Sequence, residues 1–345
     1  MDKKSLLDVP FSDWPKLIES LGEPSFRAQQ LVEWVFKKRE RSIEEMSNLP
    51  AGLRKKLGDE YEIQSLFLDN VIASQLDGTS RYFFKTRDNQ IVSCVYLPFE
   101  KRRSLCISSQ VGCAWGCVFC ASGKVKFQRN LSAGEIVDQI MLVEKVSNEK
   151  IDSVLFMGMG EPLANFNSLV SALQIIRSDI ALGYGARHVT VSTCGLVPQI
   201  EMLAAQAPKV NLAISLHAAF DELRKELLPK SSSWSIKELM NAAKTFSMKT
   251  NSRVTFEYIV LDGINDSEQD AKRLANLVRG PAQQGDYWVN LIAYNPVPGL
   301  PYKKPDPEKL EKFRDILTKR HVPVRLRKPQ GVDIGAGCGQ LGEAR

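Results

Sequence analysis

The 345-residue sequence lacks the features of a membrane-bound or secreted protein. One uncharged stretch, residues 104–123, is as long as a membrane-spanning helix, but it contains Ser, Gln, Gly and four cysteines instead of aliphatic residues. The first residues are charged where a signal peptide needs an apolar core. We therefore expect a soluble cytoplasmic protein without a membrane partner, and we expect a monomer.

Histidine is scarce, and the cysteines are odd in number. The three histidines (His188, His217 and His321) lie far from one another, and the seven cysteines leave one unpaired in any disulfide scheme. Without a secretory signal, this cysteine usage indicates thiols, a metal site or catalysis. A disulfide framework is excluded as the main source of stability, because a chain of this length buries a large core without one.

Neither composition nor net charge is extreme. Hydrophobic residues make up 43% and charged residues 25%, which excludes a disordered chain. The net charge of +6 is unevenly distributed, because residues 101–129 and 319–328 hold six and five basic residues and no acidic one. The remaining sequence has a net charge of −5. Such clusters are either ordinary solvated surface or the electrostatic footprint of a nucleic-acid partner.

The hydrophobic patterns divide the chain into four segments. Residues 1–60 have helical spacing and predict a helical accessory domain, and residues 61–98 predict a short antiparallel sheet with turns at 77–78 and 88–89. Residues 99–330 alternate short aliphatic runs with helical stretches, which is typical of a parallel α/β sheet. Residues 331–345 form a glycine-rich tail.

Six or seven β/α units favour a partial (β/α)6 barrel over a doubly wound sheet. We expect buried strands at 105–108, 153–157, 188–192, 210–215, 253–260 and 288–292, with a possible seventh at 322–326. We expect helices at 133–146, 169–176, 236–246, 269–278 and 308–319. In such barrels the chemistry takes place where the strands end. The residues that follow each strand are therefore the candidates for a site.

Three cysteines follow the first strand, in the sequence Cys113-Ala-Trp-Gly-Cys117-Val-Phe-Cys120. Three thiolates within eight residues can bind one ion or one small cluster. Zinc usually takes four closed ligands in two separated pairs, and no second cysteine pair or nearby histidine is present. A three-cysteine loop on a 4Fe–4S cluster would leave one iron open to another ligand.

Polar residues also follow the later strands. Gly160 and Glu161 close the second strand, in a turn where the backbone could approach a ligand and a carboxylate could accept from an ammonium group. Ser192, Ser215, His217 and Asn295 follow the next strands. Cys338 lies between glycines in the tail, where it is either a mobile nucleophile whose thiolate neighbouring cations would favour or an ordinary thiol.

Together these motifs resemble the RlmN/Cfr family of radical S-adenosylmethionine (SAM) methyltransferases. The likeness extends from the N-terminal helices to Leu341, and Pro162 after Glu161 favours the RlmN branch. The resemblance implies a radical SAM barrel with one 4Fe–4S cluster on Cys113, Cys117 and Cys120. It also implies SAM contacts at Gly160, Glu161, Ser192, Ser215, Leu216, His217 and Asn295.

The resemblance further implies methylation of C2 of adenosine in two RNAs, with two SAM molecules per turnover. The substrates would be the peptidyl-transferase centre of 23S rRNA and the adenosine 3′ to the anticodon of tRNA. Cys338 would first accept a methyl group from one SAM, and the second SAM would give a radical that activates this group for addition to the base. Cys106 would then release the product by forming a transient disulfide with Cys338. The electron would come from a donor such as a flavodoxin and its reductase.

Three positions depart from the family pattern. Ser93 stands where an acidic proton acceptor is usual, Cys194 where Ser is usual, and Gly337 where Ala is usual. Ser93 leaves the acceptor of the C2 proton unassigned. Two alternatives stand beside the C2 methyltransferase: a Cfr-type adenine-C8 methyltransferase, and a metal-stabilised RNA-binding protein without catalysis.

Overall fold

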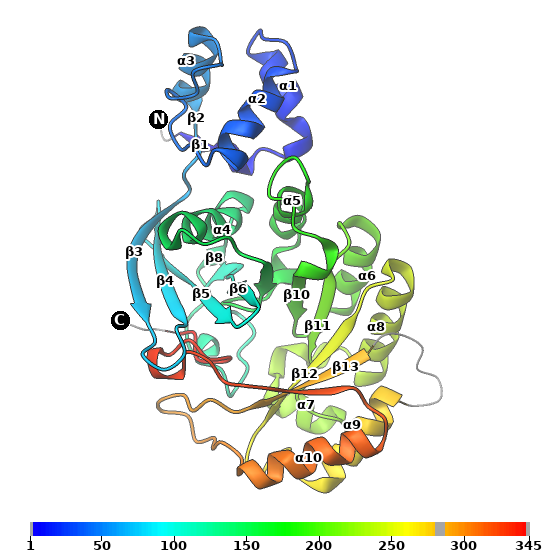
Figure 1. The fold of residues 1–345 in the computed structure, drawn as a ribbon. Helices are drawn as coiled ribbons and strands as arrows, with labels where there is room; N and C mark the ends of the chain where they lie inside the picture. The colour runs from blue at the N-terminus through cyan, green and yellow to red at the C-terminus, as the bar shows by residue number, and fades with distance from the viewer. Residues whose placement is uncertain (1–2, 280–286, 343–345) are drawn as a thin grey trace.

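A ten-stranded mixed sheet runs through the body of the molecule (Figure 1). The structure, a computed structural model, describes residues 3–279 and 287–342. The order of the strands is β14-β13-β12-β11-β10-β9-β6-β5-β4-β3, and every pairing from β6 to β14 is parallel. The parallel strands are β6 (Arg102–Cys106), β9 (Ser153–Phe156), β10 (Val189–Thr193), β11 (Asn211–Ser215), β12 (Val254–Val260), β13 (Tyr287–Ala293) and β14 (Val324–Arg327).

The predicted α/β barrel is confirmed, including its seventh strand. Each predicted strand matches an observed one within a few residues, because buried parallel strands are continuous aliphatic runs. Helices α6 and α7 are additional to those predicted. The helices of the barrel are α4 (Ala133–Ser147), α5 (Phe166–Arg177), α6 (Val197–Gln206), α7 (Asp221–Leu227), α8 (Ile236–Thr250), α9 (Glu268–Arg279) and α10 (Pro307–Lys319). No helix among the described residues is long and apolar enough to span a membrane.

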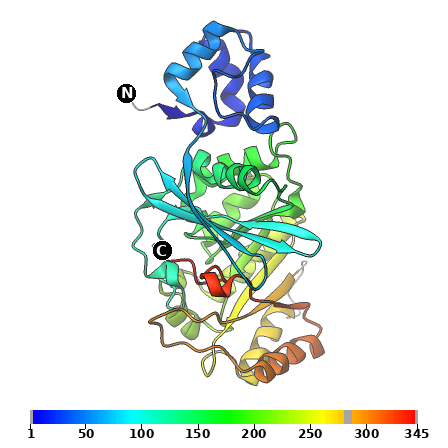
Figure 2. The ribbon, with the colours of Figure 1, turned by 60° about the vertical axis from the view of Figure 1, so that its left-hand side comes forward.

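The three antiparallel strands extend the sheet of the barrel instead of forming a separate one. They are β3 (Leu66–Ala73), β4 (Ser80–Thr86) and β5 (Ile91–Phe99). Strand β5 pairs with β6, with Val95 opposite Cys106, so it satisfies the backbone groups along the edge of β6. In Figure 2 the C-terminal tail lies just below these strands, which therefore form one side of the barrel opening.

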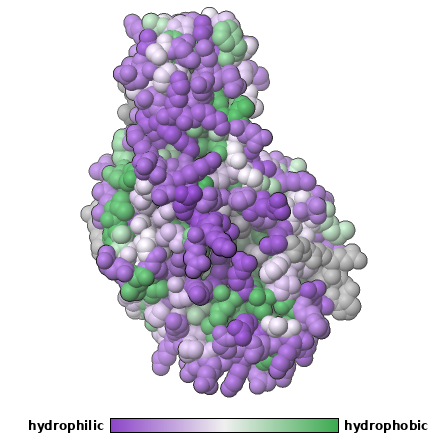
Figure 3. All heavy atoms as spheres, in the orientation of Figure 1, coloured by the Kyte–Doolittle hydropathy of each residue, from purple (hydrophilic) through white to green (hydrophobic). Residues whose placement is uncertain are grey.

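The N-terminal residues form a separate lobe above the body (Figures 1 and 2). It contains α1 (Trp14–Ser20), α2 (Arg27–Val32), a π-helical turn (Glu33–Lys37), α3 (Ala51–Glu60) and a parallel pair of short strands, β1 (Lys4–Ser5) and β2 (Tyr61–Glu62). Its helices pack around the buried side chains of Trp14, Ile18 and Phe36. Figure 3 shows that the face of this lobe turned to the viewer is mostly hydrophilic.

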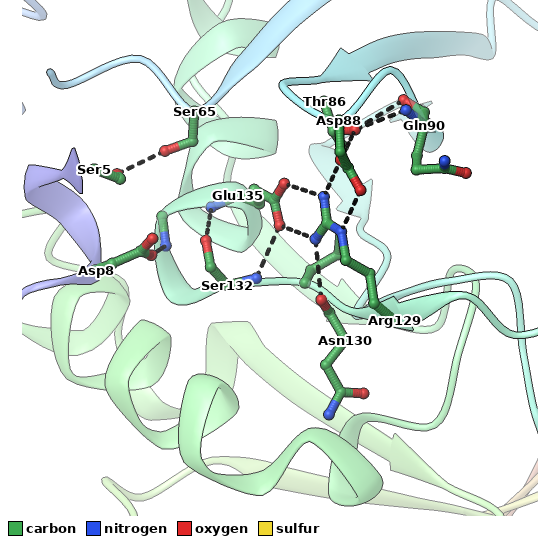
Figure 4. A network of polar contacts seen from close by, with 12 residues as sticks. Ser5, Asp8, Ser65, Thr86, Asp88, Gln90, Arg129, Asn130, Ser132 and Glu135 are labelled. Atoms are coloured by element: carbon green, nitrogen blue, oxygen red, sulfur yellow. Dashed lines mark hydrogen bonds and ion pairs between the residues drawn. The ribbon is translucent and has the colours of Figure 1, made fainter. Parts of the chain in front are cut away.

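Polar contacts attach this lobe to the N-terminal end of α4 (Figure 4). Asp8 accepts a hydrogen bond from the Gly134 amide (2.7 Å), and the hydroxyls of Ser5 and Ser65 lie 2.7 Å apart. Beside them, Arg129 forms ion pairs with Asp88 and with Glu135. A carboxylate at a helix N-terminus is favoured by the free amides and the helix dipole, so Asp8 fixes the lobe to the barrel.

Candidate active site

The three-cysteine motif forms a loop after β6 and the short strand β7 (Gln110–Val111), which pairs with β8 (Arg129–Asn130). Gly112 turns the chain into this loop at a φ of +73°. A Cβ atom there would lie 2.3 Å from the carbonyl oxygen of Lys126, so only glycine fits. The loop begins with this close approach between its two ends.

Cys113, Cys117 and Cys120 line one cavity of about 150 Å³, which we call the cysteine cavity. Among the described residues, no three Cys, His, Asp or Glu side chains are arranged to hold a single metal ion. A cavity that three thiols share offers cysteine ligands of the kind that an iron–sulfur cluster takes. Burial raises the pKa of Cys113 to about 12 and that of Cys120 to about 11.

Glu161 is a buried carboxylate in the wall of the cysteine cavity. Its oxygens accept hydrogen bonds from the amides of Leu163 (2.9 Å) and Cys194 (2.6 Å), which fix its orientation. Burial raises its pKa to about 7, against the lowering effect of these two bonds. The adjacent Gly160 has a φ of +98°, and a Cβ atom there would lie 2.5 Å from the Gln110 side chain.

His217 lines the same cavity with an unusual backbone conformation, at a φ of +58°. Its Nδ1 accepts a hydrogen bond from the Ile259 amide (3.0 Å), and its ring contacts the Phe119 ring edge-to-face at 5.0 Å. Burial, with a smaller effect of the Arg224 charge, lowers the pKa of His217 to about 3. The imidazole is therefore neutral, with its orientation fixed by the phenylalanine of the cysteine loop.

A larger cavity of about 790 Å³ adjoins the cysteine cavity. We call it the basic cavity, because the described residues that line it include five cationic side chains and one carboxylate, that of Asp77. These cations come from both basic segments of the sequence: Lys101, Arg102, Arg325, Arg327 and Lys328. The two basic segments, far apart in the sequence, therefore meet at one cavity through these five residues.

Cys338 lines both cavities, and Cys106 lines the basic one. Burial raises the pKa of Cys106 to about 12, and the nearby Cys338 contributes to this shift. Desolvation also raises the pKa of Cys338, although its residue is exposed to the cavity space and Arg327 acts in the opposite direction. Arg327 therefore favours the Cys338 thiolate, as expected of a neighbouring cation, but desolvation has the larger effect on the pKa.

The tail that carries Cys338 is held by side chains of the antiparallel strands and the barrel. The buried Arg81 donates to the carbonyl oxygens of Gly335 and Gly342, both at 3.1 Å. Asn295 donates to the carbonyl oxygen of Cys338 itself (3.1 Å), and Asp77 accepts from the Gly331 amide (2.8 Å). The described part of the tail therefore has a fixed path across the basic cavity.

The three departures from the family pattern have distinct surroundings. Ser93 accepts two hydrogen bonds from Arg81, at 3.2 and 3.3 Å, so it supports the tail anchor. The Cys194 sulfur lies 3.9 Å from that of Cys117. A Cβ atom at Gly337 would lie 2.9 Å from Nδ2 of Asn295, so glycine gives this amide its space.

Not every expected site residue points into the cysteine cavity. Ser192 and Ser215 do line it, whereas Asn295 lines the basic cavity and the Leu216 side chain lies in the hydrophobic core. Two residues on the cavity walls, Glu257 and Arg327, are additional to those expected. A glutamate within the apolar run 254–260 was a sequence signal for the first of them.

Comparison with known proteins agrees with this geometry. Residues 107–275 match the family model of the radical SAM superfamily, and residues 4–63 match that of the ribosomal RNA large subunit methyltransferase N-terminal domain. A probable dual-specificity RNA methyltransferase RlmN from Endomicrobium trichonymphae is 42% identical over 99% of this chain and 97% of its own. The chain belongs to the RlmN family of radical SAM RNA methyltransferases.

Two further relatives give the same result. The dual-specificity RNA methyltransferase RlmN of Anaeromyxobacter dehalogenans (strain 2CP-C) is 43% identical over 99% of this chain and 92% of its own. The crystal structure of a radical SAM methyltransferase from Sphaerobacter thermophilus superposes with a TM-score of 0.91 at 37% identity, covering 97% of this chain and 98% of that one. Membership in the RlmN family makes this chain an enzyme and removes the non-catalytic RNA-binding alternative.

The RlmN family implies a 4Fe–4S cluster and SAM as cofactors. The cysteine cavity fits both groups, because it joins three thiols to a fixed carboxylate and to the hydroxyls of Ser192 and Ser215. The cysteines would hold the cluster, and Glu161 would accept from the amino group of SAM.

Proposed function

We propose that this enzyme methylates C2 of adenosine in 23S rRNA, at the peptidyl-transferase centre, and in tRNA, at the adenosine 3′ to the anticodon. The proposal is supported by the full-length similarity to RlmN methyltransferases and by the two thiols on a cationic cavity. The position of Cys338 between the two cavities carries the proposal. A thiol there can reach a cofactor on one side and a base on the other.

The cofactors would bind in the cysteine cavity. One cluster would be held by Cys113, Cys117 and Cys120, and two SAM molecules would be used per turnover. When bound, they supply a methyl group to a nucleophile and a carbon radical that removes a hydrogen atom. Gly160, Glu161, Ser192, Ser215, Leu216, His217 and Asn295 would contact SAM. Leu216 would do so through its backbone, since its side chain is in the core.

Cys338 would be the methyl acceptor and Cys106 the thiol that releases the product. For the first step Cys338 must lose its proton, and Arg327 lowers the cost of doing so. For release, the Cys106 thiolate would attack the Cys338 sulfur, so that the S–S bond forms as the bond from that sulfur to the transferred carbon breaks. The electron pair of the broken bond stays on carbon, which then takes up a proton.

RNA would approach the opening of the barrel from the side of the basic cavity. Residues 1–60 would form an accessory RNA-binding domain, residues 61–98 the antiparallel extension, 99–330 the barrel and 331–345 the catalytic tail. Residues 1–2, 280–286 and 343–345 of these segments lie outside the described residues. We propose a cytoplasmic monomer that receives its electron from a donor such as a flavodoxin with its reductase.

Mass spectrometry of nucleosides from rRNA and tRNA tests the proposed function. A strain without this gene should lose 2-methyladenosine from both RNAs, and expression of the wild-type enzyme should restore it. Persistence of 2-methyladenosine in the deletion strain would contradict the proposal. Loss of 8-methyladenosine instead would identify a Cfr-type enzyme.

A further inference from the structure

Glu257 has a buried carboxylate oxygen without a protein partner. The residue is 5% exposed and lies on β12, with its side chain in the wall of the cysteine cavity. Oε1 accepts hydrogen bonds from Asn290 Nδ2 (2.7 Å) and Thr255 Oγ1 (3.0 Å), which fix the carboxylate. Oε2 is buried and has no hydrogen-bond partner among the described residues. An unpartnered buried oxygen is costly, so a donor from outside the chain would be favoured there.

The other carboxylates on the two cavities are satisfied by the protein. Both oxygens of Glu161 accept from backbone amides, and both oxygens of Asp77 accept from the amides of Thr79 and Gly331. Arg327 lines the same cavity as Glu257, yet no ion pair joins the two among the described residues. Among the described carboxylates on these walls, Glu257 is therefore the one with an oxygen that no protein donor satisfies.

The ligand group that fits this oxygen is a hydroxyl on a ribose. Besides its ammonium group, for which Glu161 is the candidate acceptor, SAM has donors on its ribose and on its adenine amine. Glu257 lies opposite Ser215 in the pairing of β11 with β12, and both residues line the cavity. Ile259 and Ile292 line the same cavity and offer apolar surface for the adenine ring, so the sugar would lie nearer the carboxylate.

We propose that Glu257 Oε2 accepts a hydrogen bond from a ribose hydroxyl of SAM. The bound sugar satisfies an oxygen that the protein leaves without a partner, and Asn290 and Thr255 hold the carboxylate ready for it. The inference rests on the proposed use of the cysteine cavity for SAM. A ribose of the RNA has the same chemistry, but Glu257 is absent from the lining of the basic cavity.

Binding of S-adenosylhomocysteine and its 2′-deoxy and 3′-deoxy analogues tests this contact, measured by calorimetry on the anaerobically reconstituted holoenzyme. In the wild type, removal of the contacted hydroxyl should weaken binding about tenfold or more. In Glu257→Ala the same removal should change affinity less than about twofold. Glu257→Gln keeps the side-chain volume and one acceptor oxygen, so removal of the hydroxyl should weaken its binding to an intermediate extent. This variant replaces Glu257→Ala in the test if the alanine variant folds poorly.

Asp270→Asn is the matched control, because Asp270 is a buried carboxylate that accepts from Ser267 outside the cavities. It should discriminate the analogues as the wild type does. Equal losses for the deoxy analogues in the wild type and in Glu257→Ala would overturn the proposal. The proposal would also be overturned if Glu257→Ala no longer discriminated against a deoxyadenosine at the RNA target but still discriminated against the deoxy analogues of S-adenosylhomocysteine. If the analogues behaved as expected in both proteins but the enzyme formed no 2-methyladenosine, the proposed function would be refuted and the contact of Glu257 with SAM would stand.

Discussion

The two adjoining cavities share Cys338 and Arg327 but are built differently. The cysteine cavity is lined mainly by strand ends and the cysteine loop, and hydrogen bonds within the protein fix its Glu161 carboxylate and its His217 ring. In the basic cavity, none of the five cationic side chains forms an ion pair with a described residue. One cavity is prepared for a small ligand of fixed shape, and the other presents free positive charge to a large anionic partner.

The contrast shows that basic residues of one sequence segment can have different roles. Whether an acidic side chain pairs with each of them decides the role, and the structure is needed to see this pairing. Arg103 and Arg129 belong to the same basic segment as Lys101 and Arg102, yet Glu149, Asp152, Asp88 and Glu135 neutralise them. A desolvated or paired cation contributes to the fold, whereas an unpaired one remains available for phosphate. The following predictions test this division, beginning with Cys338, which lines both cavities.

Replacing Cys338 by alanine should have the largest effect. The variant lacks the nucleophile and should lower RNA methylation by about a thousandfold or more, while the cluster absorbance and SAM cleavage remain. Anaerobic assays of methylated RNA and of 5′-deoxyadenosine measure the two activities. Cys94→Ser is the matched control, since Cys94 is a buried thiol that lines neither cavity. Full methylation by Cys338→Ala would refute the proposed role.

Neutralising the basic cavity should weaken RNA binding in a salt-dependent manner. For Lys101→Gln and Lys328→Gln, the slope of log affinity against log salt should become shallower by about 1 for each phosphate that the variant no longer binds. Each substitution should reduce affinity about tenfold at 0.1 M salt. Lys272→Gln is the control, because this lysine pairs with Glu268 on the surface of α9. Unchanged slopes in both cavity variants would show that RNA binds elsewhere.

The sequence predicted the fold better than it predicted which charged residues are paired and which line the basic cavity without an acidic partner. The aliphatic run in β12 and the spacing of Cys113, Cys117 and Cys120 are local signals, so the strand and the cysteine loop follow from neighbouring residues. The pairing of a charge is not local. Arg129 and Arg327 look alike in the sequence, but Asp88 lies 41 residues from Arg129 and no described acid pairs with Arg327.

The tail is a further case in which distant residues decide the site. The sequence indicated that Cys338 could be mobile, but Arg81 holds the tail from a strand more than 250 residues earlier, as the separation of 254 residues from Gly335 shows. Asn295, which the resemblance places beside SAM, also donates through its amide to the Cys338 carbonyl, a contact that the sequence did not indicate. Such contacts depend on the closed barrel and have no local pattern.

Weakening the contacts between Arg81 and the tail should reduce methylation moderately. The effect should be confined to the tail that carries Cys338. In Arg81→Lys, one ammonium group cannot replace the contacts to Gly335, Gly342 and Ser93, so the tail should become more mobile. Methylation should fall about threefold to tenfold, and hydrogen exchange should increase in residues 335–342. SAM binding in the cysteine cavity should stay unchanged. A fall in SAM affinity equal to that in methylation would contradict this separation.

The smallest effects should come from the paired arginine of the first basic segment. Arg129 binds Asp88 and Glu135, and its hydrogen bond keeps the pKa of Asp88 below the usual value of 3.8. A depressed carboxyl pKa stabilises the fold above the unfolded pKa, and this contribution is lost as the pH falls through the folded pKa. Because both side chains are partly exposed, Asp88→Asn should cost less than about 1 kcal/mol at pH 7.

Denaturation of the wild type and Asp88→Asn between pH 7 and pH 3 measures this contribution, and the difference should shrink below about pH 4. Salt titration of RNA binding by Arg129→Gln supplies the contrast with Lys328→Gln. Because Arg129 is already neutralised by two carboxylates, its slope should match that of the wild type. A slope shallower by about 1 would place Arg129 among the phosphate-binding cations and would remove the distinction between paired and free charge.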